Sequence, residues 1–369
     1  MSIEVQTATT EAEREAIYRF RYDIYVEEMG RYQATADHDG RRLVEPEDVN
    51  GNHVFAVDDR GDVVGVARGS WGGAGPFSER QVRQYGLEPF LAEIPADRVT
   101  VGERAMIRPD HRGTDLWLRF MQHSLGFANE KRIVASFGAC EPHLLSLYLG
   151  LGARTFADQN INSAEAGYLI PILWLPGDAG YLEELGSPLA GFVEDRGLQD
   201  VPSVIHEVIA TGGAVRSHRL SVDDTFGHEV RRALDELGDG SLSAVAGLTE
   251  DEVALLLDHS NIIDCCAGDL VLKKGGVARN LFVVLDGFLE VRAEDRVLSV
   301  LGPGQVFGEM AFLLEQPRSR DVFAATDGTR VLSLSDGHLR RLIDREPRAA
   351  ALLLMNLSRM LCFRLITQV

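Results

Sequence analysis

The chain has few cysteines and no pattern of metal-binding residues. Its 369 residues include four cysteines, without a CxxC pair or a spaced Cys/His set: Cys140, Cys265, Cys266 and Cys362. The 10 histidines form no HExxH-type motif. These absences argue against a zinc site and against a disulfide framework, so we predict a reduced protein without a bound metal.

Long apolar runs and positive charge are also scarce. No run approaches the ~18 residues that a membrane-spanning helix needs, and the first residues lack the apolar core of a signal peptide. Lys and Arg number 37 against 56 Asp and Glu, which gives a net charge of −19. This charge opposes non-specific attraction to a polyphosphate. We therefore expect a cytoplasmic protein that has no transmembrane segment and does not bind nucleic acid.

The length predicts two to three domains, and the composition, 45% hydrophobic and 25% charged, is ordinary for a globular protein. Glycine and proline recur between about residues 177 and 243, where short helices are plausible at Val204–Ile209 and Gly227–Leu237. We interpret this stretch as a helical linker that passes ligand state between domains. The predicted organisation is a domain at 1–176, the linker at 177–243 and a domain at 244–369.

The most informative stretch is residues 307–322, FGEMAFLLEQPRSRDV. The backbone amides from Gly308 onward and at Ser319 could form a nest for an anion, and Arg318 supplies a planar fork that matches phosphate oxygens. Glu309 is an acceptor for a ribose 2′-hydroxyl. The spacing of nine residues between Glu309 and Arg318 places both at one pocket if a short helix and a turn lie between them.

This stretch resembles the phosphate-binding cassette of cyclic nucleotide-binding domains, which begins F-G-E-[LIM]-A and ends P-R-[AST]. Upstream, the apolar runs 281–285 and 288–291 flank Asp286-Gly287 and predict two strands with a tight turn, where that family has a β-roll. Arg320 stands where the family has a small residue. The resemblance covers about 248–364 and implies a final helix that caps the nucleotide. It also implies a cyclic nucleotide site, with cAMP favoured over cGMP, formed by Gly308, Glu309, Met310, Ala311, Arg318 and Ser319.

The N-terminal half alternates strand and helix patterns. The expected elements are a helix at 11–29 capped by Thr10, a hairpin at 53–57 and 63–69, a strand at 98–107, a helix at 116–129, a buried strand at 133–137, a short helix at 144–149 and a strand at 168–174. Pro171 favours an edge position for the last strand. This order predicts a mixed α/β sheet flanked by helices.

Two segments of this half resemble the GNAT acyltransferases. Residues 107–113, IRPDHRG, are similar to the strand exit and pyrophosphate loop of that family, and residues 144–153, LLSLYLGLGA, to its later helix. The resemblance implies a coenzyme A or carrier-linked donor, held by helix-start amides together with Arg108, Arg112, Gly113 and Thr114. The chain departs from the family at Asp115 and Trp117, which would repel or crowd a diphosphate there.

Residues 20–30, FRYDIYVEEMG, together with Asp48 and residues 102–107, GERAMI, resemble acyl-homoserine-lactone synthases and long-chain N-acyl amino acid synthases. Those enzymes transfer an acyl group from acyl carrier protein or acyl-CoA to an amine. Of the residues that carry the likeness, Arg21 and Arg104 could hold a carboxylate of the acceptor, or could be surface ion pairs. Asp48 is a weaker candidate for binding the acceptor amine, because acidic loop residues are usually solvated. Acyl transfer also needs a base and an acid, for which Glu103 and Tyr148 are the candidates. The alternative is an exposed carboxylate paired with Arg68 or Arg104, and a tyrosine that serves packing.

We therefore predict an N-acyltransferase that is allosterically regulated by a cyclic nucleotide and acts on a primary amine. A cAMP-regulated protein-lysine acetyltransferase is the near alternative, and a non-catalytic sensor of acyl thioesters and cyclic nucleotides is a third. A transcription regulator is not expected, because no helix-turn-helix follows the capping helix and the chain is acidic. Acyl carrier protein is a possible partner, and a dimer is compatible with the sequence.

Overall fold

The structure is a computed structural model. It describes residues 3–157, 160–163, 165–197, 201–211, 215–217, 244–257, 260–276, 280–294, 296–314, 316–334 and 336–367. The chain divides into two compact units. The first comprises Met1–Ala139, Leu147–Ala157 and Pro171–Gly212, and the second comprises Cys140–Ser146, Asp158–Ile170 and Gly213–Val369. The predicted helix at 227–237 lies outside the described residues, and the three-part division remains a prediction.

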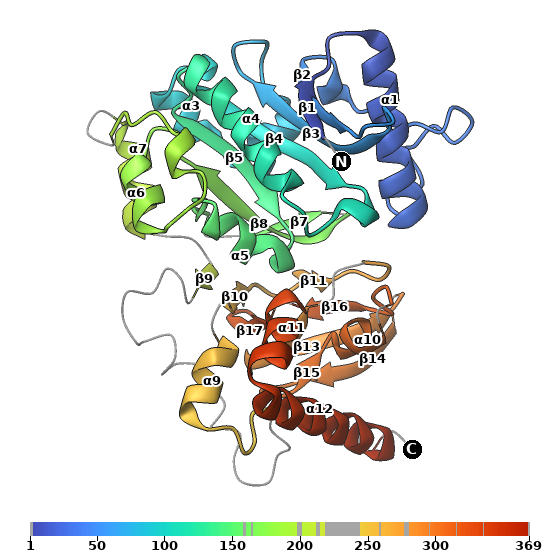
Figure 1. Cartoon of the computed structure of the whole chain (residues 1–369). Coiled ribbons are helices and arrows are strands. Elements are labelled where there is room, and N and C mark those ends of the chain that lie inside the picture. Colours follow the sequence, from blue (N-terminus) through green and yellow to red (C-terminus); the bar gives the residue numbers. More distant parts are fainter. Residues whose placement is uncertain are drawn as a thin grey trace. The chain divides into compact units, whose positions relative to one another are not determined.

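The first unit is built on a mixed sheet (Figure 1). Its strand order is β1 (Glu4–Thr7), β2 (Gly51–Val57), β3 (Val63–Trp71), β4 (Val99–Ile107), β5 (Ala135–Cys140), β8 (Gly167–Trp174) and β6 (Arg154–Thr155), with β7 (Ile161–Ser163) also paired to β8. Strands β1 to β4 pair antiparallel, whereas β4 and β5 are parallel. β7 and the start of β8 are counted with the second unit.

The helices around this sheet are α1 (Glu11–Arg21), a π-helix (Tyr22–Glu28), α2 (Glu79–Gln84), α3 (Glu88–Glu93), α4 (Leu116–Glu130), α5 (Leu145–Gly150), α6 (Ala179–Glu184) and α7 (Ser203–Thr211). Short 3₁₀ turns lie at Pro46–Asp48, Ala96–Arg98, Pro109–His111, Pro142–Leu144 and Ala190–Phe192. In the part of the chain that the structure describes, no helix is long and apolar enough to cross a membrane.

Alternation along β2 explains why helices cover both faces of the sheet. Phe55 points to the face that packs against Ile17 and Phe20 of α1, whereas Val54 and Ala56 pack against α4. Thr10 begins α1 with the predicted cap, because its hydroxyl accepts from the Glu13 amide while the Glu13 carboxylate accepts from the Thr10 amide. The predicted mixed α/β sheet flanked by helices is confirmed.

The predicted edge position of the 168–174 strand is wrong, because β8 lies between β5 and the short strands β6 and β7. Its outer side pairs through Gly167–Leu169 with β7 and through Ile172 and Leu173 with β6. Pro171 falls between these two short registers. The missing N–H of proline therefore interrupts no ladder with either of these neighbours, and an internal strand can contain it.

The second unit contains two antiparallel sheets. One has the order β15 (Val306–Phe307), β12 (Leu281–Asp286), β17 (Thr329–Leu334), β10 (Asn261–Cys265) and β9 (Val215–Ser217). The other has the order β11 (Leu270–Leu272), β16 (Asp321–Ala324), β13 (Leu289–Ala293) and β14 (Arg296–Leu301). The helices of this unit are α9 (Glu250–Leu257), α10 (Glu309–Leu314), α11 (Asp336–Arg345) and α12 (Pro347–Thr367). The predicted β-roll with capping helices is confirmed.

The two strands predicted on either side of Asp286-Gly287 are present, but they do not pair with each other. β12 pairs with β15 and β17, whereas β13 pairs with β14 and β16, so the turn carries the chain from one sheet to the other. Gly287 has a φ of +73°, and a Cβ there would lie 2.4 Å from Thr329 Oγ1. The turn therefore requires glycine at this position.

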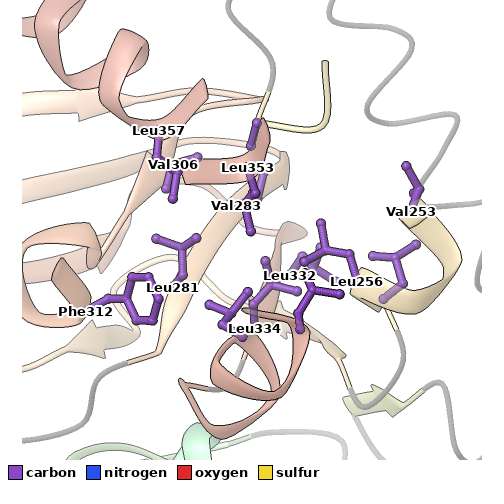
Figure 2. Close-up of a cluster of buried hydrophobic side chains, with 14 of the residues drawn as sticks. Val253, Leu256, Leu281, Val283, Val306, Phe312, Leu332, Leu334, Leu353 and Leu357 are labelled. Atoms are coloured by element: carbon purple, nitrogen blue, oxygen red, sulfur yellow. The ribbon is translucent and has the colours of Figure 1, made fainter. Parts of the chain in front are cut away.

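The core of the second unit joins the β-roll to its helices. Leu281, Val283 and Leu332 of the sheet pack with side chains of α9, α10 and α12 (Figure 2). The members that Figure 2 labels are Val253, Leu256, Leu281, Val283, Val306, Phe312, Leu332, Leu334, Leu353 and Leu357. Burial of these apolar side chains fixes α10 and α12 against the strands that surround the phosphate-cassette segment.

Candidate functional sites

The phosphate-cassette segment folds as the strand β15, the short helix α10 and a return through Arg318. Gly308 joins β15 to α10 with a φ of +80°. A Cβ on Gly308 would lie 2.5 Å from Nη1 of Arg318 and 2.9 Å from the Asn280 carbonyl oxygen. Glycine is required here both for its backbone conformation and for the close approach of the guanidinium.

Arg318 is buried, and its partners are carbonyl oxygens. It is 5% exposed, with Nη1 donating to Gly308 O at 2.7 Å and Nη2 to Asn280 O at 2.8 Å. Among the described residues Nε has no partner, and the guanidinium forms no ion pair. Burial lowers the pKa of Arg318 to about 10, against the attraction of Glu309 and, more weakly, Glu141. The site therefore holds a charged guanidinium whose desolvation is only partly offset by Glu309 and Glu141, with no direct ion pair among the described residues.

Glu309 lies beside this guanidinium and is itself paired. It is 7% exposed, and its Oε1 accepts a hydrogen bond from Arg364 Nη1 at 3.0 Å. The predicted neighbours take different positions. Ala311 is buried, Met310 is half exposed, and the Ser319 hydroxyl lies 3.9 Å from the Met310 sulfur.

The unusual residue Arg320 is exposed, in contrast to the buried Arg318, and its Nη1 donates to Ser319 O at 2.7 Å. The structure thus brings Gly308, Glu309 and Arg318 together, as the spacing predicts. Sequence reasoning missed Arg364 and Asn280. The basic side chain in the last turn of the capping helix was a usable signal for Arg364, but nothing in the sequence marks the carbonyl of Asn280.

The first unit contains a buried cluster of charged side chains. Arg21, at the end of α1, pairs with Asp48 at 2.7 Å. Arg68 of β3 binds Asp48 at 2.9 Å, Glu103 at 2.9 Å and Glu45 at 3.0 Å. The structure thus brings the predicted acceptor residues Arg21 and Asp48 into one network with Glu103, and Arg68 joins them.

Glu103 accepts hydrogen bonds from four side chains. These are Arg68 at 2.9 Å, Arg80 at 2.8 Å, Gln81 at 2.8 Å and Tyr85 at 3.2 Å. Burial alone would raise the pKa of Glu103, but Arg68, Arg80 and Arg104 outweigh it and lower the pKa to about 2. Such a carboxylate is a weak proton acceptor whose lone pairs are occupied. These contacts favour an electrostatic anchor, and the predicted role as general base stays a prediction.

Arg104 adopts a strained backbone conformation in the same network. Its φ is +55°, and it lies in a β-bulge, since Arg104 and Ala105 together face the single residue Ala67 between the pairs Arg68–Glu103 and Val66–Met106. Its side chain pairs with Glu45 through both Nε and Nη2. The guanidinium also lies over the rings of Tyr25 and Tyr32, at 5.9 and 5.1 Å. A left-handed non-glycine residue held this firmly is typical of functional sites.

The charges of this cluster balance. Four guanidinium groups, those of Arg21, Arg68, Arg80 and Arg104, pair with four carboxylates, those of Glu45, Glu47, Asp48 and Glu103. Arg21 and Arg104 are therefore already compensated. A further carboxylate that bound Arg21 or Arg104 would have to displace a carboxylate of the protein.

His53 completes the cluster as a neutral side chain. Burial, assisted by Arg21, lowers the pKa of His53. Arg21 Nη2 donates to Nδ1 at 3.2 Å, so the proton sits on Nε2, which donates to Asp48 O at 3.2 Å. The pairing of Glu103 with Arg68, the alternative that the sequence offered, is confirmed, although the carboxylate is buried and not exposed. Sequence reasoning missed six other members of this network because they come from separate segments: Glu45, Glu47, His53, Arg80, Gln81 and Tyr85.

The arginines of the predicted donor loop already form ion pairs with carboxylates of the protein. Arg112 forms two hydrogen bonds to the Glu28 carboxylate, at 2.7 and 3.0 Å, and Arg108 binds Asp110 at 2.8 Å. Gly113 has a φ of +78°, and the Thr114 hydroxyl donates to His111 O at 2.8 Å. A diphosphate at this loop would have to compete with Glu28 and Asp110 for these arginines.

The two residues at which the loop departs from the GNAT pattern are both turned away from it. Asp115 is exposed and pairs with Arg119 at 2.9 Å. Trp117 packs inward, with its ring edge-on to Tyr148 at 5.5 Å, and Tyr148 meets Trp174 at 5.4 Å. Tyr148, the candidate acid on α5, thus lies in an aromatic cluster with Trp117 and Trp174. β4 and β5 pair only as far as Val101 and Phe137, so the sheet opens beyond that point.

Comparison with known proteins identifies the class of the site around Arg318. Residues 263–346 match the family model of the cyclic nucleotide-binding domain, which confirms the predicted resemblance for this part of the chain. The region around Arg318 is a cyclic nucleotide-binding domain. Among the described residues, no group of three or more His, Cys, Asp or Glu side chains is placed to hold a metal ion.

Among curated proteins, the chain is similar to glutaminase 2 of Bradyrhizobium diazoefficiens, with 37% identity over 131 residues, 34% of this chain and 20% of that enzyme. It is also similar to the cyclic AMP receptor protein of Thermus thermophilus, with 32% identity over 124 residues, 32% of this chain and 55% of that protein. The chain thus spans about a fifth and about half of the lengths of these two relatives. Their whole-protein activities therefore do not transfer to it.

A solved structure of a CoA-dependent acyl-homoserine lactone synthase, BjaI, is similar to the chain at 17% identity and a TM-score of 0.39. The match covers 57% of this chain and all of that one. This likeness is too weak to carry an argument about activity. The chemistry of the first unit must be argued from its own residues.

Proposed function

We propose that the second unit binds a cyclic nucleotide and that this ligand regulates acyl transfer by the first unit. The donor is acyl-CoA or acyl carrier protein, and the acceptor is a primary amine, either an amino acid-like molecule or a protein lysine. One observation carries the regulatory half of this proposal: Arg318 is a buried guanidinium without an ion pair among the described residues, in a segment of the matching family.

A cyclic phosphate fits the needs of Arg318. The guanidinium has lost most of its hydration, and carbonyl oxygens only partly replace it. An anion that reached the unsatisfied Nε would form a charge-assisted hydrogen bond and remove the uncompensated charge. Glu309, next to it, can accept a ribose hydroxyl, as the sequence predicts. cAMP is the favoured nucleotide.

The acyl-transfer half is supported by local geometry in the first unit. The bulge at Arg104 takes one residue out of the β3–β4 ladder, and β4 separates from β5 after Val101. Backbone N–H groups released in this way are suitable donors to a thioester oxyanion. Tyr148 remains the candidate acid for the leaving thiolate, and the neutral charge cluster around Glu103 would hold β4 in place.

Calorimetric titration of the full chain with cAMP and cGMP tests the regulatory half. We expect micromolar or tighter binding that Arg318→Ala abolishes and Arg320→Ala leaves intact, because Arg320 is exposed whereas Arg318 is buried. Absence of heat with both nucleotides in a folded sample would contradict it. Release of free thiol from acyl-CoA in the presence of amines, with and without nucleotide, then tests the catalytic half.

A non-catalytic sensor is the second candidate, and the contacts of Glu103 favour it. A carboxylate with four side-chain donors and a pKa of about 2 has little capacity to take a proton from an amine. Acyl-thioester binding without turnover under any nucleotide condition would support the sensor. Turnover that survives Glu103→Gln would instead support an acyltransferase that uses another base.

A further inference from the structure

Glu309, the candidate acceptor for the ribose, has a cationic partner on the capping helix. Arg364, in the last turn of α12, donates from Nη1 to Glu309 Oε1 at 3.0 Å and from Nη2 to Val306 O at 2.6 Å. The side chains are 28% and 10% exposed, so the pair is largely shielded from solvent. Arg364 thereby links the helix both to the carboxylate of the cassette and to the strand that leads into it.

Packing of α12 holds Arg364 at this position. Leu353 and Leu357 insert into the core of the second unit, the cluster that also includes Val306 (Figure 2). Arg364 follows Leu353 by 11 residues and Leu357 by seven, which is about three and two helical turns. It therefore projects from the same face of α12 as the two buried leucines. The packing of α12 against the core therefore places Arg364 in contact with Glu309.

The charges around Arg318 explain the effect of the contact between Arg364 and Glu309. Glu309 attracts Arg318 without forming an ion pair with it. If Glu309 had no other partner, its negative charge would offset that of Arg318 and oppose an incoming phosphate. Arg364 pairs with Glu309, and together with Arg318 these side chains carry a net charge of one positive unit. Glu141 acts on Arg318 more weakly than Glu309 does. A cyclic phosphodiester carries one negative charge and balances this excess.

We propose that Arg364 is a positioning residue of the nucleotide site. It neutralises Glu309, so that Arg318 is reserved for the phosphate, and it holds the Glu309 carboxylate toward the ribose. Arg364 occupies Oε1, and a carboxylate has about four acceptor positions, so capacity for a ribose hydroxyl remains. This inference rests on the proposed binding of a cyclic nucleotide.

Calorimetric titration of the full chain with cAMP and cGMP tests the role of Arg364. We expect Arg364→Gln to weaken binding about tenfold, equivalent to about 1.4 kcal/mol, and Arg364→Lys to retain most of the affinity because it keeps the charge. Arg359→Gln is the matched control. It removes the same charge from an exposed position of the same helix and should leave the affinity unchanged. Thermal unfolding followed by circular dichroism shows that each variant is folded.

A double-mutant cycle distinguishes action through Glu309 from direct contact with the ligand. In a Glu309→Gln background, Arg364→Gln should cost no further affinity, because no carboxylate charge remains to neutralise. An additive loss would mean that Arg364 acts on the nucleotide itself and would overturn the proposal. Unchanged or tighter binding by Arg364→Gln alone would also overturn it. If the wild-type chain binds neither nucleotide, the proposed function fails as well.

Discussion

Arg68 and Arg318 are both buried arginines, one in each unit, but their surroundings differ. Arg68 contacts three carboxylates, which raise its pKa against the opposing effect of burial. Among the described residues, Arg318 donates to carbonyl oxygens and lies over the ring of Phe282 without an ion pair, and burial lowers its pKa to about 10. Burial alone therefore does not identify a ligand site. A charge that the protein compensates is typical of a structural network, whereas an uncompensated one indicates a place for an anion.

The largest expected effect comes from breaking the compensated network. Arg68→Met leaves Asp48 and Glu103 without their shared cation, and removal of one partner from a buried ion pair costs about 3–5 kcal/mol. The three tryptophans, Trp71, Trp117 and Trp174, all belong to the first unit. Urea unfolding followed by their fluorescence therefore reports on this unit specifically.

Arg119→Met is the control for Arg68→Met. Arg119 pairs with Asp115 on the surface, one turn away on α4, and such exposed pairs contribute about 0.5 kcal/mol or less. If the two variants lose similar stability, the charge cluster contributes little to folding. The contrast between Arg68, whose charge the protein compensates, and Arg318, whose charge it does not, would then not hold.

Acid should weaken the first unit by a similar mechanism. The pKa of Glu103 is lowered from 4.5 to about 2, so its contribution to stability is present above pH 4.5 and is lost as the pH falls toward 2. This single group should cost on the order of 2 kcal/mol between pH 7 and pH 3. Tryptophan-monitored unfolding at a series of pH values measures this loss.

The variant Glu103→Gln tests that assignment, because it lacks the titrating group and should show a flatter pH dependence. Other groups of the first unit whose pKa values are lowered, among them Asp48, His53 and Asp110, contribute to the remaining slope. An identical pH dependence in the variant and the wild type would contradict the pairing of Glu103 with Arg68 and Arg80.

A smaller effect is expected from substitution of Gly308, because the absence of a side chain there leaves room for the Arg318 guanidinium. Gly308→Ala forces a non-glycine residue to a φ of +80° and places a Cβ 2.5 Å from Nη1 of Arg318. We expect a loss of about 1–2 kcal/mol in the stability of the second unit, together with weaker nucleotide binding. Gly328→Ala is the matched control, because its φ is +70° but no atom lies within 4 Å of the added Cβ. Equal stability and equal binding in the two variants would show that the contact with Arg318 is unimportant.

Local signals predicted much of the fold. The Thr10 cap, the β2–β3 pair and the Leu116–Glu130 helix follow from patterns of neighbouring residues. The errors arose where pairing between distant segments decides the outcome. Pro171 is internal because two short strands flank it, and Asp286-Gly287 connects two sheets instead of closing a hairpin.

The candidate sites show the same difference between local signals and contacts that join distant segments. Gly308, Glu309 and Arg318 lie within one short segment, so their spacing alone predicted a common pocket. The charge cluster draws Glu45, Arg68 and Arg80 from separate segments, and only the folded chain shows that Glu103 is surrounded by donors. The state of a carboxylate depends on its neighbours in space, which a motif does not specify.

The most direct test of the account compares cAMP with adenosine in calorimetric titrations of the wild-type chain. Both present the same base and a ribose with a 2′-hydroxyl, but only cAMP carries the anion that would compensate Arg318. The account predicts measurable binding of cAMP and at least a hundredfold weaker binding of adenosine, about 2.7 kcal/mol. Equal affinity for the two ligands would show that Arg318 is not the anion site.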